Sequence, residues 1–88
     1  MRVKYGKRFL ADIAQIPSAR RSAIEAFAFE EVPRLKSLGE SGKIEKLKGY
    51  EYYYKARFGP YRVGIRFEGG VISLERVLHR REIYRFFP

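Results

Sequence analysis

The feature that most constrains the fold is a pair of segments, residues 52–58 and 61–67, in which polar and apolar side chains alternate on either side of Gly59-Pro60. A period of two is typical of β-strands with one buried face. Glycine accepts the positive φ at the first position of a type II′ turn, and the φ of the second position lies near the value that proline imposes. The pattern therefore predicts an antiparallel hairpin with Phe58 opposite Tyr61.

This register sorts the side chains of the hairpin by charge, with the apolar ones on the face that must cover the helices. The opposite, exposed face collects Tyr53, Lys55, Arg57, Arg62 and Arg66. Because Arg57 lies directly opposite Arg62, two like charges face each other, which is destabilising unless an anion is shared between them. Arginine binds phosphate oxygens through two parallel hydrogen bonds, and Tyr53 can stack on an unpaired base. The face is a candidate phosphate-binding surface, and the alternative is a solvated strand face partly neutralised by nearby glutamates.

A third strand is predicted over residues 72–78, which makes the sheet a meander. Its apolar side chains face the core if the inward-pointing residues are Ile72, Leu74 and Leu78. The same alternation turns Arg76 inward at the margin of the sheet. It also places three residues on the cationic face, namely Glu75, Val77 and His79.

Two helices are expected before the sheet, preceded by a short edge strand over residues 2–5. The first helix covers residues 7–16 and stops at Pro17, while the second begins at Ser18 or Ser22 and is kinked or ended by Pro33. The two helices should form a hairpin. Residues 39–49 carry three glycines and several charges, so they are expected to form a mobile connection that Ile44 and Leu47 pin to the body.

The C-terminal residues 78–88 hold the single histidine of the chain, beside two arginines and shortly before a tyrosine. Histidine titrates near neutral pH and is suited to proton transfer. His79, Arg80 and Tyr84 are therefore candidate functional residues. The alternative to a functional role is a structural one, in which the segment forms a basic cap on the sheet and is anchored in the core by Ile83, Phe86 and Phe87.

The composition indicates which binding partners and which cellular compartment to expect for the protein. Nineteen Lys and Arg residues against ten Asp and Glu give a net charge of +9 over 88 residues, which favours nucleic acid as the first partner and an acidic protein as the second. The length fits a single domain over residues 1–88. The lack of cysteine and the single histidine disfavour a metal site, and cytoplasm is the default compartment. No apolar run approaches the roughly 20 residues that span a membrane.

Three motifs, in this order, resemble the RelE branch of the RelE/ParE toxins. They are Lys-Leu-Lys-Gly at residues 46–49, Tyr-Lys-Ala-Arg-Phe-Gly-Pro-Tyr-Arg-Val at 54–63, and His-Arg-Arg-Glu-Ile-Tyr at 79–84. The specificity comes from the three together, since each alone is weak. The resemblance covers essentially the whole chain. It implies an α+β fold in which an N-terminal strand and a helical hairpin pack on an antiparallel β-sheet meander, with a short C-terminal helix or tail.

The same resemblance implies a toxin of a type II toxin-antitoxin system. Such a toxin is a cytoplasmic endoribonuclease that works without metal or other cofactor, docks in the decoding site of the 30S ribosomal subunit and cleaves messenger RNA. A cognate antitoxin holds it inactive, and a toxin-antitoxin heterotetramer is one assembly compatible with the resemblance. No membrane partner is implied.

Matched residue by residue, the resemblance assigns catalytic roles to Lys55, Arg57, Arg62, Arg80 and Tyr84, with Arg62 as the phosphate-binding arginine. His79 joins the catalytic candidates because it is the one imidazole in the chain. Further RNA-binding candidates are Lys48, Tyr53, Arg66 and Arg81. The turn at Gly59-Pro60 is shorter than in the best-known family members. Arg57 stands where some members carry lysine, and a guanidinium hardly deprotonates.

Attack by a ribose 2′-hydroxyl on the adjacent phosphate needs a base, an acid for the leaving oxygen, and cations around the transition state. The chain has one histidine, so a mechanism with one histidine as base and another as acid is impossible. Lys55 or Tyr84 would then share the proton transfers with His79. The identity of the base stays open. Two alternatives also stay open, which are a ParE-like poison of DNA gyrase without nuclease activity and an RNA-binding module without catalysis.

Overall fold

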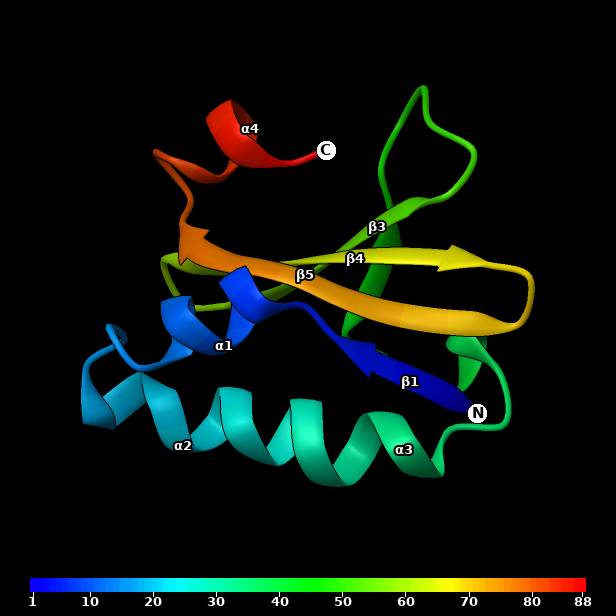
Figure 1. The fold of residues 1–88 in the computed structure, drawn as a ribbon, viewed down its shortest axis with the longest axis horizontal. Coiled ribbons are helices and arrows are strands. Elements are labelled where there is room, and N and C mark those ends of the chain that lie inside the picture. The colour runs from blue at the N-terminus through cyan, green and yellow to red at the C-terminus, as the bar shows by residue number, and fades with distance from the viewer.

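The computed structural model describes residues 1–88 and arranges five strands in one sheet, in the order β1-β5-β4-β3-β2 (Figure 1). The strands are β1 (Arg2–Tyr5), β2 (Ile44–Lys46), β3 (Tyr53–Phe58), β4 (Tyr61–Glu68) and β5 (Val71–His79). Strands β2 to β5 are antiparallel neighbours, whereas β1 pairs parallel with β5. The predicted α+β class and the edge position of the N-terminal strand are confirmed, and the sheet is mixed rather than wholly antiparallel.

The register of the β3–β4 hairpin is the predicted one. Phe58 pairs with Tyr61 and Arg57 with Arg62, so the cationic side chains share one face. Gly59 has a φ of +57°, the positive value that the turn requires at this position. The turn is therefore responsible for placing both arginines on the same side.

The helical layer lies on the other side of the sheet (Figure 1). Helix α1 (Lys7–Ile13) ends at Ile13 rather than at residue 16, because a tight turn follows in which Ile16 donates to the carbonyl of Ile13. Helix α2 (Ser18–Ala26) begins directly after Pro17, so Ser22 lies inside it. A π-helical turn, η1 (Phe27–Glu31), and α3 (Val32–Arg34) continue the same segment, which ends one residue after Pro33.

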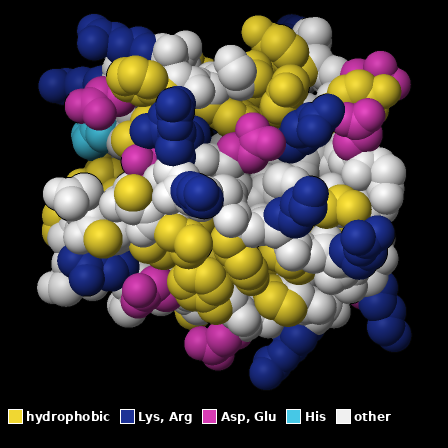
Figure 2. Space-filling view, in the orientation of Figure 1, with side chains coloured by type: hydrophobic (Ala, Val, Ile, Leu, Met, Phe, Trp, Pro, Cys, Tyr) yellow, Lys and Arg dark blue, Asp and Glu magenta, His cyan; other side chains and the backbone are white.

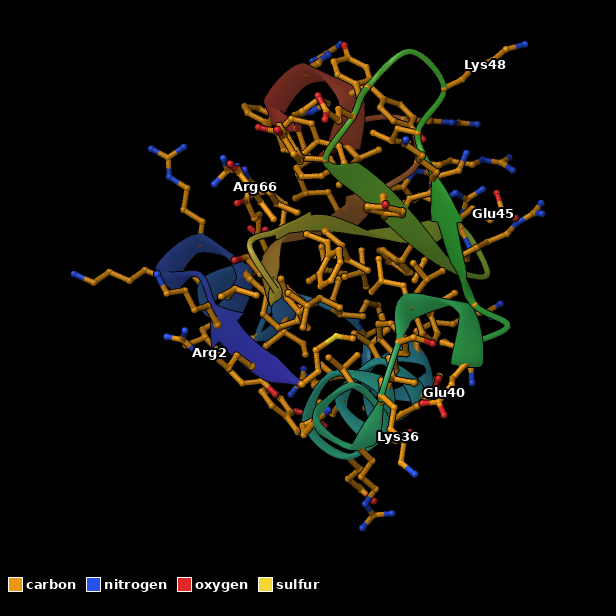
Figure 3. The ribbon with its side chains drawn as sticks, turned by 90° about the vertical axis from the view of Figure 1, so that its right-hand side faces the viewer. Arg2, Lys36, Glu40, Glu45, Lys48 and Arg66 are labelled. Carbon is orange, nitrogen blue, oxygen red and sulfur yellow. The ribbon has the colours of Figure 1, made fainter.

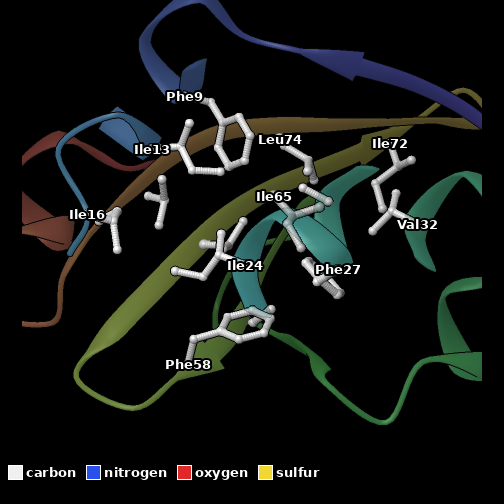
Figure 4. Close-up of a cluster of buried hydrophobic side chains, with 14 of the residues drawn as sticks. Phe9, Ile13, Ile16, Ile24, Phe27, Val32, Phe58, Ile65, Ile72 and Leu74 are labelled. Atoms are coloured by element: carbon white, nitrogen blue, oxygen red, sulfur yellow. The ribbon is translucent and has the colours of Figure 1, made fainter. Parts of the chain in front are cut away.

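One apolar core joins the helices to the sheet (Figure 4). Phe9 and Ile13 from α1, together with Ile24 from α2, point toward the strands. The strand side chains that meet them are Ala56, Phe58, Val63, Ile65, Ile72, Leu74 and Val77. The core therefore uses the apolar face that the alternation in β3 and β4 predicts.

The segment predicted as a mobile connection is ordered by pairing. Residues Leu38–Glu40 form a 3₁₀ turn, η2, and β2 pairs with β3 through Ile44 opposite Ala56. The Lys43 ammonium hydrogen-bonds Glu31 at 2.7 Å and lowers the pKa of that carboxyl. The sequence did not predict β2, because three residues are too few to show an alternation.

A β-bulge in β5 corrects the predicted orientation of its second half. Gly64 pairs with Arg76, whereas the next residue, Ile65, pairs with Leu74, so β5 holds one extra residue there. Beyond the bulge the two faces exchange. Val77, predicted on the cationic face, is buried in the main core, and His79, predicted on that face too, lies opposite Tyr61 on the helix side. Arg76 and Leu78, predicted to point inward, lie on the cationic face. Strict alternation cannot anticipate an inserted residue.

The C-terminal segment folds back over the sheet face opposite α2 (Figure 1). It contains helix α4 (Ile83–Phe86), and Ile83 and Phe87 form a second apolar cluster with Leu47. Both aromatic anchors were expected to be buried, but Phe86 is 55% exposed. The tail therefore covers part of the face that the sequence predicted to be open.

An ion pair with little exposure to solvent holds the edge of β5 where β1 no longer covers it. Asp12 of α1 accepts hydrogen bonds from Nε of Arg76 at 2.7 Å and from the backbone N–H of Val77 at 3.1 Å. The two side chains are only 15% and 12% exposed. The hydrogen bond to Asp12 raises the pKa of Arg76, so the guanidinium stays charged. Asp12 thus supplies the acceptor that a strand partner would otherwise provide.

We expect the substitution Asp12→Ala to lower the free energy of unfolding by about 3 kcal/mol, because it leaves a mostly buried guanidinium unpaired. Urea denaturation followed by circular dichroism measures this loss. Glu30→Ala is the control, since that carboxylate makes no ion pair and its removal should change stability by less than about 0.5 kcal/mol. Equal stability of the two variants would contradict the role given to Asp12.

Candidate functional site

A small cationic hollow lies at the β2 side of the face opposite the helices. It has a volume of about 190 Å³ and is lined by Glu45, Lys55, Arg57 and Arg62. Its composition follows from strand pairing, because Arg57 lies opposite Arg62 and Lys55 lies opposite Glu45. The structure thus brings together the three hairpin cations that the sequence placed on one face. We call this site the hairpin hollow.

The charges of the hairpin hollow are left largely uncompensated. The ion pairs of the chain use Glu31, Glu68 and Asp12, and none of them involves a cation of the hollow. Arg62 is held in place because its Nη1 donates to the carbonyl oxygens of Gly59 at 2.8 Å and of Tyr61 at 3.0 Å. Three cations against one carboxylate make the hollow suited to an oxyanion.

His79 lies away from the hairpin hollow, contrary to the prediction that it extends the cationic face. The bulge in β5 turns it toward Tyr61, whose ring lies edge-on at 5.7 Å. Its Nδ1 accepts a hydrogen bond from the backbone N–H of Arg81 at 3.2 Å, so a neutral imidazole carries its proton on Nε2. The imidazole therefore belongs to the end of the sheet near the turn.

The C-terminal candidates are not part of the lining of the hairpin hollow. Arg80 donates its backbone N–H to the carbonyl of Pro60 at 2.7 Å, which anchors the start of the tail to the hairpin turn. Tyr84 lies on α4 and is 56% exposed. The side chains of Arg80 and Arg81 are exposed. These residues are free to contact a ligand that extends beyond the hollow.

Tyr53 is packed instead of standing free among the cations. Its ring lies edge-on to Phe87 at 5.4 Å and to Tyr50 at 5.8 Å. The exposed aromatic ring beside it is that of Tyr50, which the sequence analysis did not single out. Figure 3 shows Lys48 extending from the loop between β2 and β3, at a distance from Arg66. Tyr53 therefore supports the tail with a half-buried ring, and its role in RNA binding stays a prediction.

Arg66 does not reach the hairpin hollow either. It forms an ion pair with Glu68, and it lines a different groove near β1. Figure 3 shows it on the opposite side of the molecule from Glu45. The predicted cationic face is thus divided into two parts, one on each side of the C-terminal segment.

The structure contains no group of three or more histidine, aspartate or glutamate side chains placed to hold a metal ion. None of its helices has the length and apolar character needed to span a membrane. Glu45 is the one lining residue of the hairpin hollow that sequence reasoning missed, because β2 itself was not predicted.

Comparisons with known proteins agree with this arrangement. A family model described as the ParE toxin of a type II toxin-antitoxin system, parDE, matches residues 3–84. A curated relative, Toxin RelE3 of Methanocaldococcus jannaschii, is 40% identical over 89 residues, which cover 100% of both chains. The RelB-RelE antitoxin-toxin complex from Methanococcus jannaschii contains a chain that superposes with a TM-score of 0.80 at 39% identity, covering 97% of this chain and 99% of that one.

A more distant structure shares the fold. A mutant of the Escherichia coli toxin RelE in the free state has a TM-score of 0.66 at 21% identity, and the match covers 96% of this chain and 90% of that one. The fold and these matches together define the toxin component of a type II toxin-antitoxin system. Within that class, the chain belongs to the RelE/ParE superfamily, as its three sequence motifs predicted.

The contact between Gly64 and the tail gives a testable consequence. A Cβ atom at position 64 would lie 2.7 Å from the ring of Phe87, so Gly64→Ala forces the tail away from the sheet. We expect a loss of about 1–3 kcal/mol in unfolding free energy, together with faster chymotryptic cleavage at Tyr84. Gly42→Ala is the matched control, because nothing lies within 4 Å of a Cβ atom there. Identical behaviour of the two variants would show that Phe87 does not occupy this place.

Proposed function

We propose that this toxin is a metal-independent endoribonuclease that cleaves messenger RNA, and that the hairpin hollow holds the phosphate at the cleaved bond. The observation that carries the proposal is the convergence of Lys55, Arg57 and Arg62 in one hollow without an ion-pair partner. Placing three like charges together has an energetic cost, which a bound phosphate removes. If the three cations had only a structural role, nothing would offset the repulsion between them.

The hollow supplies what cleavage by a neighbouring 2′-hydroxyl requires. In this reaction the 2′-oxygen attacks phosphorus while the bond to the 5′-oxygen breaks, so negative charge grows on the phosphate oxygens. Arg57 and Arg62 stabilise this charge, and the backbone carbonyls that hold Arg62 keep its guanidinium oriented before the reaction. Preorganised cations of this kind are among the largest contributions to catalysis.

Two groups of the hollow are suited to the proton transfers. The Glu45 carboxylate, which lines the hollow, accepts the proton of the 2′-hydroxyl. The Lys55 ammonium on the paired strand donates a proton to the departing 5′-oxygen. Tyr84 lies on the same side of the sheet and presents an exposed ring that can stack on a base. His79, on the helix side, has no part in these steps.

We also propose a cognate antitoxin as the protein partner and the 30S decoding site as the place of cleavage. The chain of known structure that this protein resembles at 39% identity belongs to an antitoxin-toxin complex, which supports the first proposal. The net charge of +9 supports both, because acidic protein segments and ribosomal RNA are polyanions. An antitoxin that covers the hairpin hollow would keep RNA out.

Mapping of messenger RNA ends after brief expression tests the nuclease. We expect new 5′-ends with the parent protein, and a loss of cleavage of about 100-fold or more for Arg62→Ala, because the variant lacks a cation at the transition state. Lys55→Met serves as a second variant that leaves the turn contacts of Arg62 in place. Arg34→Ala, an exposed arginine in the helical layer, is the control and should cleave like the parent.

The same experiment separates the alternatives. Unchanged cleavage by both Arg62→Ala and Lys55→Met would overturn the role of the hollow. Growth arrest with DNA-damage signalling and intact messenger RNA would instead indicate a gyrase poison, a function that the ParE description of the matching family model makes the second candidate. Thermal unfolding of each variant establishes that a loss of activity is not a loss of fold.

A further inference from the structure

A second cationic groove lies on the β1 side of the C-terminal segment. Its volume is about 700 Å³, and its lining includes five cations and an aromatic ring, which are Lys4, Lys7, Arg8, Arg66, Arg76 and Phe86. We propose that this groove, the β1 groove, binds the backbone of single-stranded RNA next to the segment held by the hairpin hollow. The proposal extends the proposed nuclease function and rests on it for the identity of the polyanion.

Strand pairing explains why these cations lie together. Lys4 of β1 is opposite Ser73 of β5, which in turn is opposite Arg66 of β4. Neighbouring strands are about 4.8 Å apart, so the Cα atoms of Lys4 and Arg66 are separated by about 10 Å. Helix α1 begins just after β1 and adds Lys7 and Arg8 at the end of the same row.

The groove carries a positive charge that its own carboxylates do not cancel. Arg66 is paired with Glu68, and Arg76 is paired with Asp12. Lys4, Lys7 and Arg8 have no ion pair, and the one acidic side chain in the lining is Glu75. Figure 2 shows Lys and Arg side chains gathered over β1, the start of α1 and β5. An anion placed here meets three cations that form no ion pair, against one carboxylate.

The shape of the groove fits a polymer better than a single ion. A neighbouring hollow of about 410 Å³ shares Lys4, Arg66 and Ser73 with it, and continues the surface to the turn between β4 and β5. Cations spaced along an elongated surface match the repeating charges of a phosphodiester chain. The groove therefore offers cations in succession for several phosphates of one chain, rather than a site for a single ion.

An exposed aromatic ring favours RNA over an acidic peptide as the occupant. Phe86 is 55% exposed, and its ring lies 5.2 Å from the guanidinium carbon of Arg76. Unpaired bases stack on such rings regardless of sequence, because every base has a π-face. A peptide carboxylate would use the cations alone. Surfaces that combine cations with an exposed aromatic ring are typical of proteins that bind single-stranded nucleic acid.

The β1 groove and the hairpin hollow lie on the same face of the sheet. Lys55 on β3, Gly64 on β4 and Arg76 on β5 form one row, and the Phe87 ring lies over its middle position. Two strand spacings separate the ends of the row by about 10 Å. One RNA strand that passes the tail can therefore contact both sites.

Fluorescence anisotropy with a labelled 2′-O-methyl oligonucleotide of about 16 nucleotides tests the groove, since this probe binds but cannot be cleaved. We expect the double variant Lys4→Gln/Arg8→Gln to bind about tenfold more weakly at 0.15 M salt, and the slope of log K against log salt to fall by about 0.7 for each lost cation. Arg34→Gln/Lys36→Gln removes the same residue types from the helical layer and should bind like the parent. Phe86→Leu should weaken oligonucleotide binding while leaving inorganic polyphosphate binding unchanged.

Equal weakening in the groove and control variants would overturn the proposal, because it would show a response to net charge alone. Weaker binding of polyglutamate with unchanged oligonucleotide binding would also overturn it and would indicate an acidic protein as the occupant. The readout is independent of cleavage. A parent protein that binds through the groove but cuts no RNA refutes the nuclease proposal alone, and a cleaving parent whose groove variant binds normally refutes the groove alone.

Discussion

The two-residue turn at Gly59-Pro60 determines which residue of β3 faces which residue of β4, and the rest of the structure depends on that register. A slip by one residue would turn the apolar side chains of a strand toward solvent and its cations toward the helices. With the observed pairing, Phe58 and Val63 enter the core while Arg57 and Arg62 meet on the opposite face. The register of the β3–β4 hairpin therefore produces both the packed core and the candidate active site.

Much of this arrangement could be read from the sequence because it follows from local chemistry. The turn residues specify the hairpin, and the alternation specifies its faces. Pro17 and Ser18 mark the boundary of the second helix. Two elements could not be read. Strand β2 is stabilised by pairing with β3 rather than by a pattern of its own, and the bulge in β5 depends on how that strand meets β4 and Asp12.

The site shows the same division between local and long-range information. Lys55, Arg57 and Arg62 belong to one hairpin, so their meeting was predictable. Glu45 enters through β2, and Arg66 is separated from the hollow by a tail whose position depends on the contact between Gly64 and Phe87. His79 changed sides because a single extra residue precedes it in β5. Errors in sequence reasoning thus arose where contacts distant in the sequence decide the orientation of a side chain.

The way in which β1 and Asp12 cover β5 also affects how the sheet meets other chains. Edge strands with free backbone groups attract further strands and promote aggregation. Here one edge is the four-residue β1, with exposed Arg2 and Lys4, and the other is the three-residue β2. The longer β5 is shielded by β1 and by the carboxylate that binds Val77. Short, charged edges disfavour sheet extension between copies, so the broad faces of the molecule are left as its surfaces for association.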